Sequence, residues 1–254
     1  MLYGGWLMKC KVAVALAVLA GGQFPVATAD EIVVAVASNF TSTLEQIADR
    51  FEAGTGHEVT IVSGATGRHY AQIVNGAPYD LFFAADAETP ARLAQEGLSK
   101  GGPVTYAQGR LALWSHDAGM IDDEGAVLRS GMFRSLAIAN PRLAPYGQAA
   151  VEVLQELALY DDLESRLVMG ENIAQTFQFV DTANAQLGFV AYSQVLTSGQ
   201  QGSWWLVPST RHSPLTQDAV LLTDHPVARE FLQFITQEEA VAFILESGYE
   251  PPAD

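Results

Sequence analysis

Hydroxyl and amide side chains follow two apolar segments near the start of the chain. Residues 32–37 form a β-branched apolar run that predicts a buried parallel strand, and Ser38-Asn39 comes directly after it. A second predicted strand, residues 58–62, leads into Gly64-Ala65-Thr66-Gly67. A helical pattern follows each segment, so unpaired backbone N–H groups and the positive end of a helix dipole accompany the hydroxyls. Two such helix starts side by side predict an anion-binding site.

The same residues also have an ordinary structural interpretation. Ser, Asn and Thr are favoured N-caps of any helix, so Ser38-Asn39 and Thr66 can serve the helices alone. Gly64 and Gly67 would let the backbone approach a ligand closely, but the motif is neither a Walker A loop nor a dinucleotide fingerprint. Arg68 suits a phosphate or carboxylate ligand, although its place in the first helical turn favours an outward direction.

The sequence lacks the motifs of the common hydrolases and metalloenzymes. It contains no G-x-S-x-G, H-E-x-x-H or C-x-x-C segment, and its five histidines are scattered. The segment Asp86-Ala87-Glu88-Thr89 resembles a phosphatase D-x-D-x-T box only in part, because Glu88 stands at the third position. A secreted hydrolase that uses Ser38 or Asp86 is the competing class, but it needs a base that the pattern does not provide. We therefore expect no catalytic residue, no cofactor and no directly held metal.

The first 29 residues have the pattern of a secretory signal peptide. Lys9 and Lys11 precede an apolar stretch over residues 12–20, and Ala27-Thr28-Ala29 provides an A-x-A cleavage site. Translation can start at the first methionine or at Met8, and the sequence leaves this open. We therefore expect a chain that is exported to the periplasm.

Composition excludes further classes of protein. Cys10 is the only cysteine, so the mature chain would have no disulfide and no cysteine-based metal site. The formal net charge of −16 disfavours binding to nucleic acid. The charge also implies that local donors, and not the net field, would capture an anion.

Strands and helices alternate along the rest of the chain, which predicts an α/β fold with mostly parallel sheets. The loop ends fall into two groups, before and after about Gly109. This grouping predicts a first lobe of residues 30–108 with 219–254, and a second lobe of residues 109–218. The strand that returns to the first lobe near Ala219 would complete two chain crossings between the lobes, which form a hinge around a ligand cleft.

Several segments in combination resemble the periplasmic molybdate-binding proteins of ABC transporters. The likeness spans almost all of residues 30–250, and its segments are VAVASNF, GATG, NGAPYDLFFAAD, ANPRLAPYG, GENIAQTFQFV and LGFVAYSQV. This family has the two-lobed periplasmic binding protein fold of type II, with mixed sheets flanked by helices and an oxyanion in the cleft between the lobes. The resemblance implies the same fold here.

The resemblance also implies a set of ligand-binding residues. The first-loop hydroxyl of the family matches Ser38, with Asn39 beside it, and the second-loop hydroxyl matches Thr66. The third-loop contact falls on Tyr146, and the backbone contact of the fourth loop falls on Ile173. These five residues are the predicted molybdate site.

One further tyrosine of the family has no clear counterpart. Part of the family binds the ligand through a tyrosine after the L-G-[IF]-V strand, and this position is Ala191 here, with Tyr192 one residue later. Because a shift of one residue re-aims a side chain, Tyr146 is the alternative source of a tyrosine hydroxyl. The sequence leaves the choice between Tyr192 and Tyr146 open.

The chemistry of molybdate suits a site made of neutral donors. Molybdate is a tetrahedral dianion that stays unprotonated near neutral pH, so it needs donors only. Hydrogen bonds to a charged group contribute about 1.5–3 kcal/mol each, and several of them account for micromolar to nanomolar binding after desolvation and closure. No lysine or arginine is required.

The resemblance therefore implies a transport protein and not an enzyme. It would capture molybdate, and tungstate too, in the periplasm and deliver the anion to an ABC permease with its ATPase. The protein would act as a monomer, with molybdenum bound only as the oxyanion. A receptor for another oxyanion, such as sulfate or a phosphonate, is the alternative within the same class.

Overall fold

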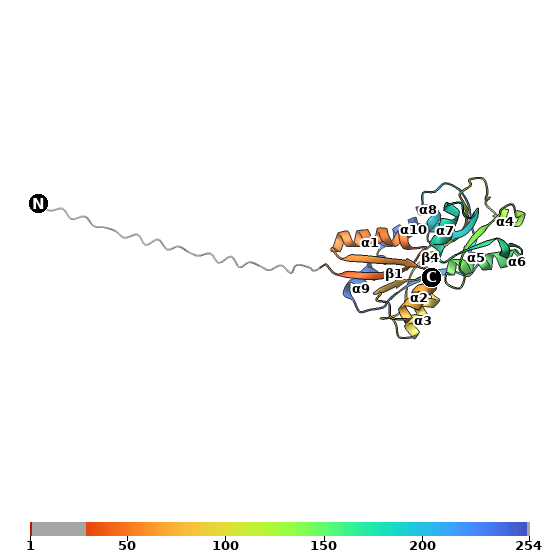
Figure 1. Cartoon of the computed structure of the whole chain (residues 1–254). Coiled ribbons are helices and arrows are strands. Elements are labelled where there is room, and N and C mark those ends of the chain that lie inside the picture. Colours follow the sequence, from red (N-terminus) through yellow and green to blue (C-terminus); the bar gives the residue numbers. More distant parts are fainter. Residues whose placement is uncertain (2–28, 253–254) are drawn as a thin grey trace.

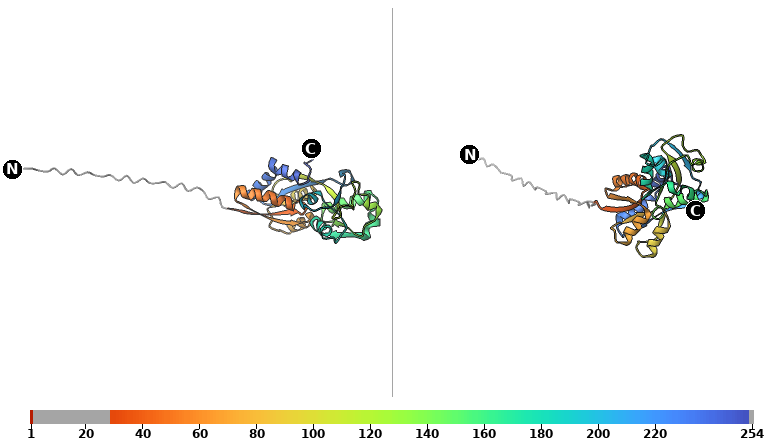
Figure 2. Two further views of the ribbon diagram at one scale, coloured as in Figure 1. Left: turned by 90° about the horizontal axis from the view of Figure 1, so that it is seen from above. Right: turned by 45° about the vertical axis from the view of Figure 1, so that its right-hand side comes forward.

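The computed structural model describes residue 1 and residues 29–252 of the chain. The predicted signal peptide, Met8 included, therefore lies outside the described residues except for its two end positions. Two five-stranded mixed sheets with flanking helices form two lobes side by side (Figures 1 and 2). This is the predicted two-lobed α/β architecture. Within residues 29–252, no helix has both the length and the apolar character needed to cross a membrane.

The sheet of the first lobe has the strand order β2-β1-β3-β10-β4. β1 is parallel to β2 and β3, whereas β10 is antiparallel to both of its neighbours. The strands are β1 (Glu31–Ala37), β2 (Glu58–Gly64), β3 (Leu81–Phe83), β4 (Val104–Gly109) and β10 (Leu215–Leu221). The helices of this lobe are α1 (Thr41–Thr55), α2 (Thr66–Val74), α3 (Glu88–Gln95), α9 (Pro226–Ile235) and α10 (Glu238–Glu246).

The sheet of the second lobe has the order β7-β6-β8-β5-β9. Its strands are β5 (Leu111–Ser115), β6 (Leu136–Ala139), β7 (Leu167–Gly170), β8 (Leu187–Ala191) and β9 (Ser203–Leu206). Its helices are α4 (Val127–Ser130), α5 (Pro145–Glu156), α6 (Tyr160–Leu163), α7 (Ile173–Asp181) and α8 (Tyr192–Thr197), with short 3₁₀ turns at Glu164–Arg166 and Ser209–Arg211. Because β6 is parallel to β7 and β8, the loops that follow β6 and β7 lie at the same edge of the sheet.

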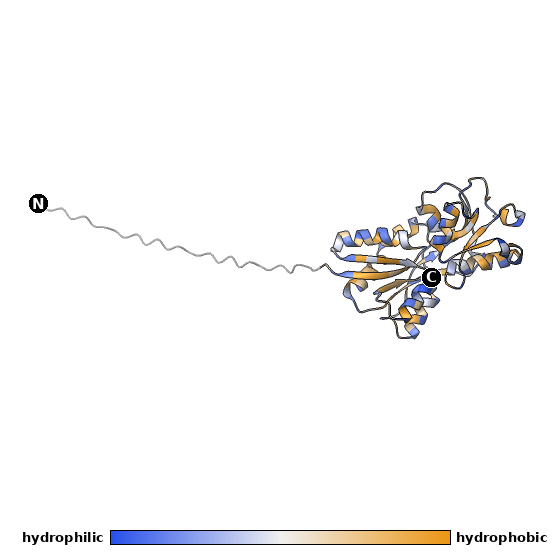
Figure 3. Cartoon of the chain, viewed as in Figure 1, coloured by the Kyte–Doolittle hydropathy of each residue, from blue (hydrophilic) through white to orange (hydrophobic). Residues whose placement is uncertain are grey.

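Apolar packing on both faces of each sheet fixes these elements. In the first lobe one core lies under α1, α9 and α10, and a second core lies under α2 and α3. The central strand β1 is therefore covered on both sides, which explains its nearly continuous apolar sequence. Figure 3 shows the same arrangement, with apolar strands inside and mixed helices outside.

The chain crosses between the lobes between β4 and β5 and again between β9 and β10. The sequence placed the start of this strand at Ala219, because Gln217 and Asp218 are polar. In the structure both residues are buried in the sheet, and β10 begins at Leu215. We propose that the second lobe ends just before Leu215, four residues earlier than the sequence suggested. The two crossings lie next to each other, since Leu215 pairs with Gly109, and we propose that they form the hinge.

Candidate functional site

Five junctions between a strand and a helix meet at one small cavity between the lobes. The junctions after β1, β2 and β3 come from the first lobe, and those after β6 and β7 come from the second. Each predicted site residue lines this cavity and is at most 7% exposed: Ser38, Asn39, Thr66, Tyr146 and Ile173. The cavity is small, with a volume of about 10 Å³. This size suits a small inorganic ion far better than an organic ligand.

Backbone N–H groups form the first set of donors at this cavity. In the described part of the chain, the backbone N–H groups of Asn39, Thr66, Tyr146 and Ile173 donate no hydrogen bond. Thr66, Tyr146 and Ile173 occupy the first turns of α2, α5 and α7, where an N–H has no partner inside the helix. The helix dipoles place partial positive charge at the same points.

Two hydroxyl groups form the second set. The Ser38 Oγ accepts the backbone N–H of Ala174 at 3.3 Å, and the Thr66 Oγ1 accepts the backbone N–H of Ala85 at 3.1 Å. Since each oxygen accepts a bond from the protein, its own proton remains to be donated to a ligand. The sequence analysis missed Ala85 and Ala174, because a backbone donor leaves no side-chain signature.

The cavity is lined by neutral residues only. No lysine, arginine, aspartate or glutamate is among the residues that line it. Arg68 points outward, with 62% of its side chain exposed, and its guanidinium lies 3.5 Å from the Glu171 carboxylate of the other lobe. An anion in this cavity would therefore be held by neutral donors in a setting without competing charges.

The side chains of two predicted ligand residues, Asn39 and Tyr146, bond to groups outside the cavity. The Asn39 amide donates to the Gln217 Oε1 at 2.9 Å and to the Tyr249 hydroxyl at 3.2 Å. The Tyr146 hydroxyl accepts from the Gln217 Nε2 at 3.1 Å and lies against Gly109, and neither of these residues lines the cavity. Their backbone N–H groups, and not their side chains, are thus the donors near the cavity.

Tyr192 lies apart from the site. It is not among the residues that line the cavity, and its ring lies 5.2 Å from the guanidinium of Arg110. Its backbone N–H donates to the Arg110 carbonyl at 2.9 Å. The structure therefore places neither candidate tyrosine hydroxyl, that of Tyr192 or that of Tyr146, at the cavity.

Direct contacts join the lobes around the cavity. The backbone N–H of Gly67 donates to the Leu143 carbonyl at 2.9 Å, and the Ser193 hydroxyl donates to the Asn39 carbonyl at 3.3 Å. A Cβ at position 67 would lie 3.1 Å from the Leu143 Cα, so this glycine permits the close approach of the two backbones.

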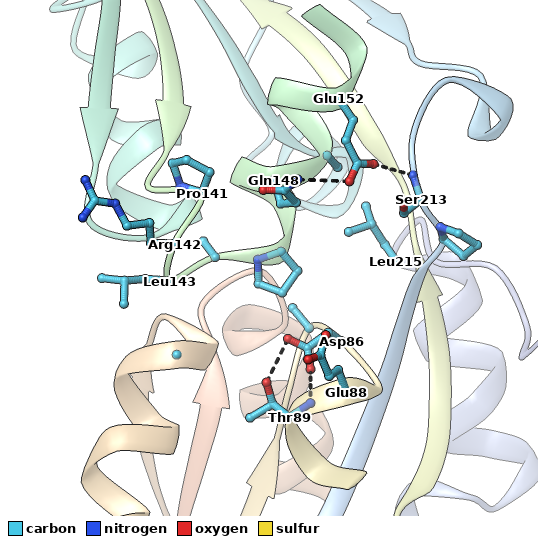
Figure 4. Close-up of a pocket in the computed structure, with 16 residues that line it drawn as sticks. Asp86, Glu88, Thr89, Pro141, Arg142, Leu143, Gln148, Glu152, Ser213 and Leu215 are labelled. Atoms are coloured by element: carbon cyan, nitrogen blue, oxygen red, sulfur yellow. Dashed lines mark hydrogen bonds between the residues drawn. The ribbon is translucent and has the colours of Figure 1, made fainter. Parts of the chain in front are cut away.

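An outer cleft of about 430 Å³ opens next to the cavity and shares Ala85, Ala144 and Pro145 with it (Figure 4). Two of its three carboxylates, those of Asp86 and Glu152, already have partners within the protein. Asp86 accepts from the backbone N–H of Thr89 at 2.7 Å and from its hydroxyl at 3.1 Å, as a helix cap does. Glu152 accepts from Gln148 and from the backbone N–H of Ser213.

This arrangement gives no support to the hydrolase alternative. Among the described residues, the only recorded hydrogen-bond partner of the Ser38 hydroxyl is the Ala174 N–H, so no histidine or carboxylate serves it as a base. The Asp86 carboxylate already accepts two hydrogen bonds from Thr89 in the first turn of α3. Within the same part of the chain, no group of three His, Cys, Asp or Glu side chains is placed to hold a metal ion.

The buried carboxylate of Asp86 makes stability depend on pH. Burial raises the pKa of Asp86, although the bonds from Thr89 lower it in part. Because the folded-state pKa is raised, the native state holds this proton more tightly than the unfolded chain, and stability is lost as the pH rises through the folded pKa.

We expect Asp86→Asn to gain stability relative to the original chain as the pH rises from 4 to 7. The neutral amide keeps an oxygen for the Thr89 N–H and has no ionisation penalty. Urea unfolding at both pH values measures the difference, with Glu88→Gln as a neighbouring control. An equal effect of Asp86→Asn at both pH values would contradict the prediction.

Comparison with known proteins agrees with this geometry. The family model of the bacterial extracellular solute-binding proteins matches residues 32–250. The molybdate-binding protein ModA of Azotobacter vinelandii is 48% identical over 229 residues, which cover 88% of this chain and 91% of that protein. ModA of Rhodobacter capsulatus is 44% identical over 241 residues, or 93% and 94% of the two chains.

A solved structure agrees as well. The Azotobacter vinelandii periplasmic molybdate-binding protein superposes with a TM-score of 0.84 at 40% identity, covering 87% of this chain and all of that one. The chain belongs to the molybdate-binding family of bacterial extracellular solute-binding proteins. The resemblance found in the sequence is thus confirmed, as is the type II fold. Membership of this family places the chain among transport components and not among enzymes.

Proposed function

We propose that this protein binds molybdate in the cavity between its lobes. The observation that carries the proposal is the donor set: four unpaired backbone N–H groups and two hydroxyl protons, drawn from both lobes, surround a cavity without a charged side chain. Such a set complements a fully deprotonated tetrahedral dianion. The proposed ligand residues are Ser38, Asn39, Thr66, Tyr146 and Ile173.

The biological role follows from the family. We propose that the protein works in the periplasm after removal of the N-terminal signal peptide, as a monomer, and delivers its anion to an ABC permease and the associated ATPase. The periplasmic molybdate-binding protein of Azotobacter vinelandii, which shares the fold, supports this location. Tungstate has the same shape and charge as molybdate, so we propose that it binds as well.

Sulfate is the anion against which the site must discriminate. It has the same charge and symmetry but shorter bonds, so the donors of a closed cavity would be stretched around it. This size argument supports molybdate over sulfate. Phosphonates carry an organic group for which the small cavity has little room.

We expect molybdate to raise the melting temperature of the purified protein at micromolar concentration. Ligand at a hundred times its Kd stabilises the native state by about 2.7 kcal/mol. Tungstate should act alike, whereas sulfate and phosphate at equal concentration should have little effect. Calorimetry with the same four anions gives the affinities. Equal affinities for sulfate and molybdate would overturn the size argument, and no response to either metal oxyanion would overturn the proposed function.

A further inference from the structure

Gln217 is a fully buried polar residue that contacts two of the proposed ligand residues without lining the cavity itself. It lies on β10 at the strand irregularity between Gln217 and Asp218, and it is 0% exposed. Its Oε1 accepts from the Asn39 Nδ2 at 2.9 Å, and its Nε2 donates to the Tyr146 hydroxyl at 3.1 Å. Asn39 belongs to the first lobe and Tyr146 to the second, so one amide joins the two lobes behind the site.

The surrounding groups hold this amide in one place. The Tyr106 hydroxyl lies 2.9 Å from the Gln217 Oε1 and 2.9 Å from the Ala84 carbonyl. Tyr249 donates to the Asn39 carbonyl at 2.8 Å and accepts from the Asn39 amide. A buried hydrogen-bond network of this kind fixes the orientation of the residues within it, although the Asn39 Oδ1 has no hydrogen-bond partner in the described part of the chain.

The network also lies at the hinge. Gly109 ends β4, where the chain crosses to the second lobe, and a Cβ at this position would overlap both the Tyr146 hydroxyl and the Gln217 amide nitrogen. Leu215, two residues before Gln217, begins the strand that follows the second crossing. Both crossings therefore pass directly beside the amide.

We propose that Gln217 is a positioning residue for anion binding, and that it acts by holding Asn39 and Tyr146 at the separation that the closed cavity requires. This proposal rests on the proposed function. The backbone N–H groups of Asn39 and Tyr146 come from opposite lobes, so an anion can use both only when the lobes are held at the correct distance. Gln217 links the side chains of these same two residues and so couples the hinge to the donors.

The test compares molybdate affinity with stability in the full chain. Gln217→Met, which removes the amide and keeps the length of the side chain, and Tyr146→Phe, which removes only the hydroxyl, should each weaken molybdate binding about tenfold. Tyr79→Phe is the matched control: it removes the hydroxyl of a buried tyrosine of the first lobe that bonds to Gln72 and lies outside this network. It should lower the ligand-free melting temperature and change affinity less than twofold.

A double-mutant cycle separates positioning from structural support. If Gln217 acts through Tyr146, then Gln217→Met should have no further effect on affinity in a Tyr146→Phe background, because the shared link is already broken. Gly109→Ala should weaken binding as well, since its added methyl group displaces both partners although position 109 does not line the cavity.

The outcomes distinguish this proposal from the proposed function. If the original chain binds no molybdate, the proposed function fails. If the original chain binds molybdate and the Gln217, Tyr146 and Gly109 variants bind it equally well, Gln217 has no positioning role. Additive losses of affinity in the double variant, or an equal loss in Tyr79→Phe, would also overturn the proposal, because general destabilisation would then explain the effect.

Discussion

Replacing Ser38 and Thr66 together by alanine should weaken molybdate binding by about 2–6 kcal/mol, because each substitution leaves one ligand oxygen without a donor at about 1–3 kcal/mol. Both hydroxyl oxygens accept a backbone N–H, from Ala174 and Ala85. Their protons are thereby directed away from the protein backbone and toward the cavity. Alanine removes the donor and leaves the backbone N–H groups at the helix starts unchanged.

Calorimetric titration of the two single variants and the double variant measures this effect. The chain provides a matched control in Thr41 and Ser63, whose hydroxyls lie 2.7 Å apart at an exposed position near the same two junctions. Thr41→Ala with Ser63→Ala removes two hydroxyls of the same kind and should leave the affinity unchanged. If the Ser38 and Thr66 double variant bound molybdate as tightly as the original chain does, the anion would have to bind elsewhere.

The positions of the donors were predictable from the sequence, because their signals are local. Ser38 and Thr66 each follow an apolar strand and precede a helical pattern, so their neighbours alone place them at helix starts. Ile173, which the family resemblance indicated, also starts a helix: the Asn172 side chain accepts the Gln175 N–H at 2.9 Å and caps α7. That the parallel strands bring these helix starts together follows from the α/β pattern.

The direction of a side chain was not predictable, because it depends on residues far away in the sequence. The Tyr146 hydroxyl, one of the two tyrosine hydroxyls between which the sequence left the choice open, bonds to Gln217, 71 residues further on. Gln217 and Asp218 also interrupt the apolar pattern of β10, so the predicted strand began at Ala219. Only the tertiary structure supplies the partners that let Gln217 lie in the sheet.

Valine at position 67 should prevent full closure of the lobes and weaken molybdate binding by about 3–6 kcal/mol, the contribution of two hydrogen bonds to a charged group. Gly67 approaches Leu143 so closely that even a Cβ would lie 3.1 Å from the Leu143 Cα. The two further methyl groups of valine have no room there unless the lobes separate. Separation would withdraw the backbone N–H groups of Tyr146 and Ile173 from an anion held by the first lobe.

Gly54→Val is the matched control, because Gly54 also lies in a helix, α1, and a Cβ there meets no atom within 4 Å. Calorimetry gives the loss of affinity, and small-angle X-ray scattering with and without molybdate reports closure. The original chain and Gly54→Val should become more compact with molybdate, whereas Gly67→Val should stay extended. Unchanged affinity without compaction in Gly67→Val would show that the second lobe supplies no donor, since a site built on the first lobe alone is indifferent to the distance between the lobes. Full compaction in Gly67→Val would show that a larger side chain at position 67 does not prevent closure.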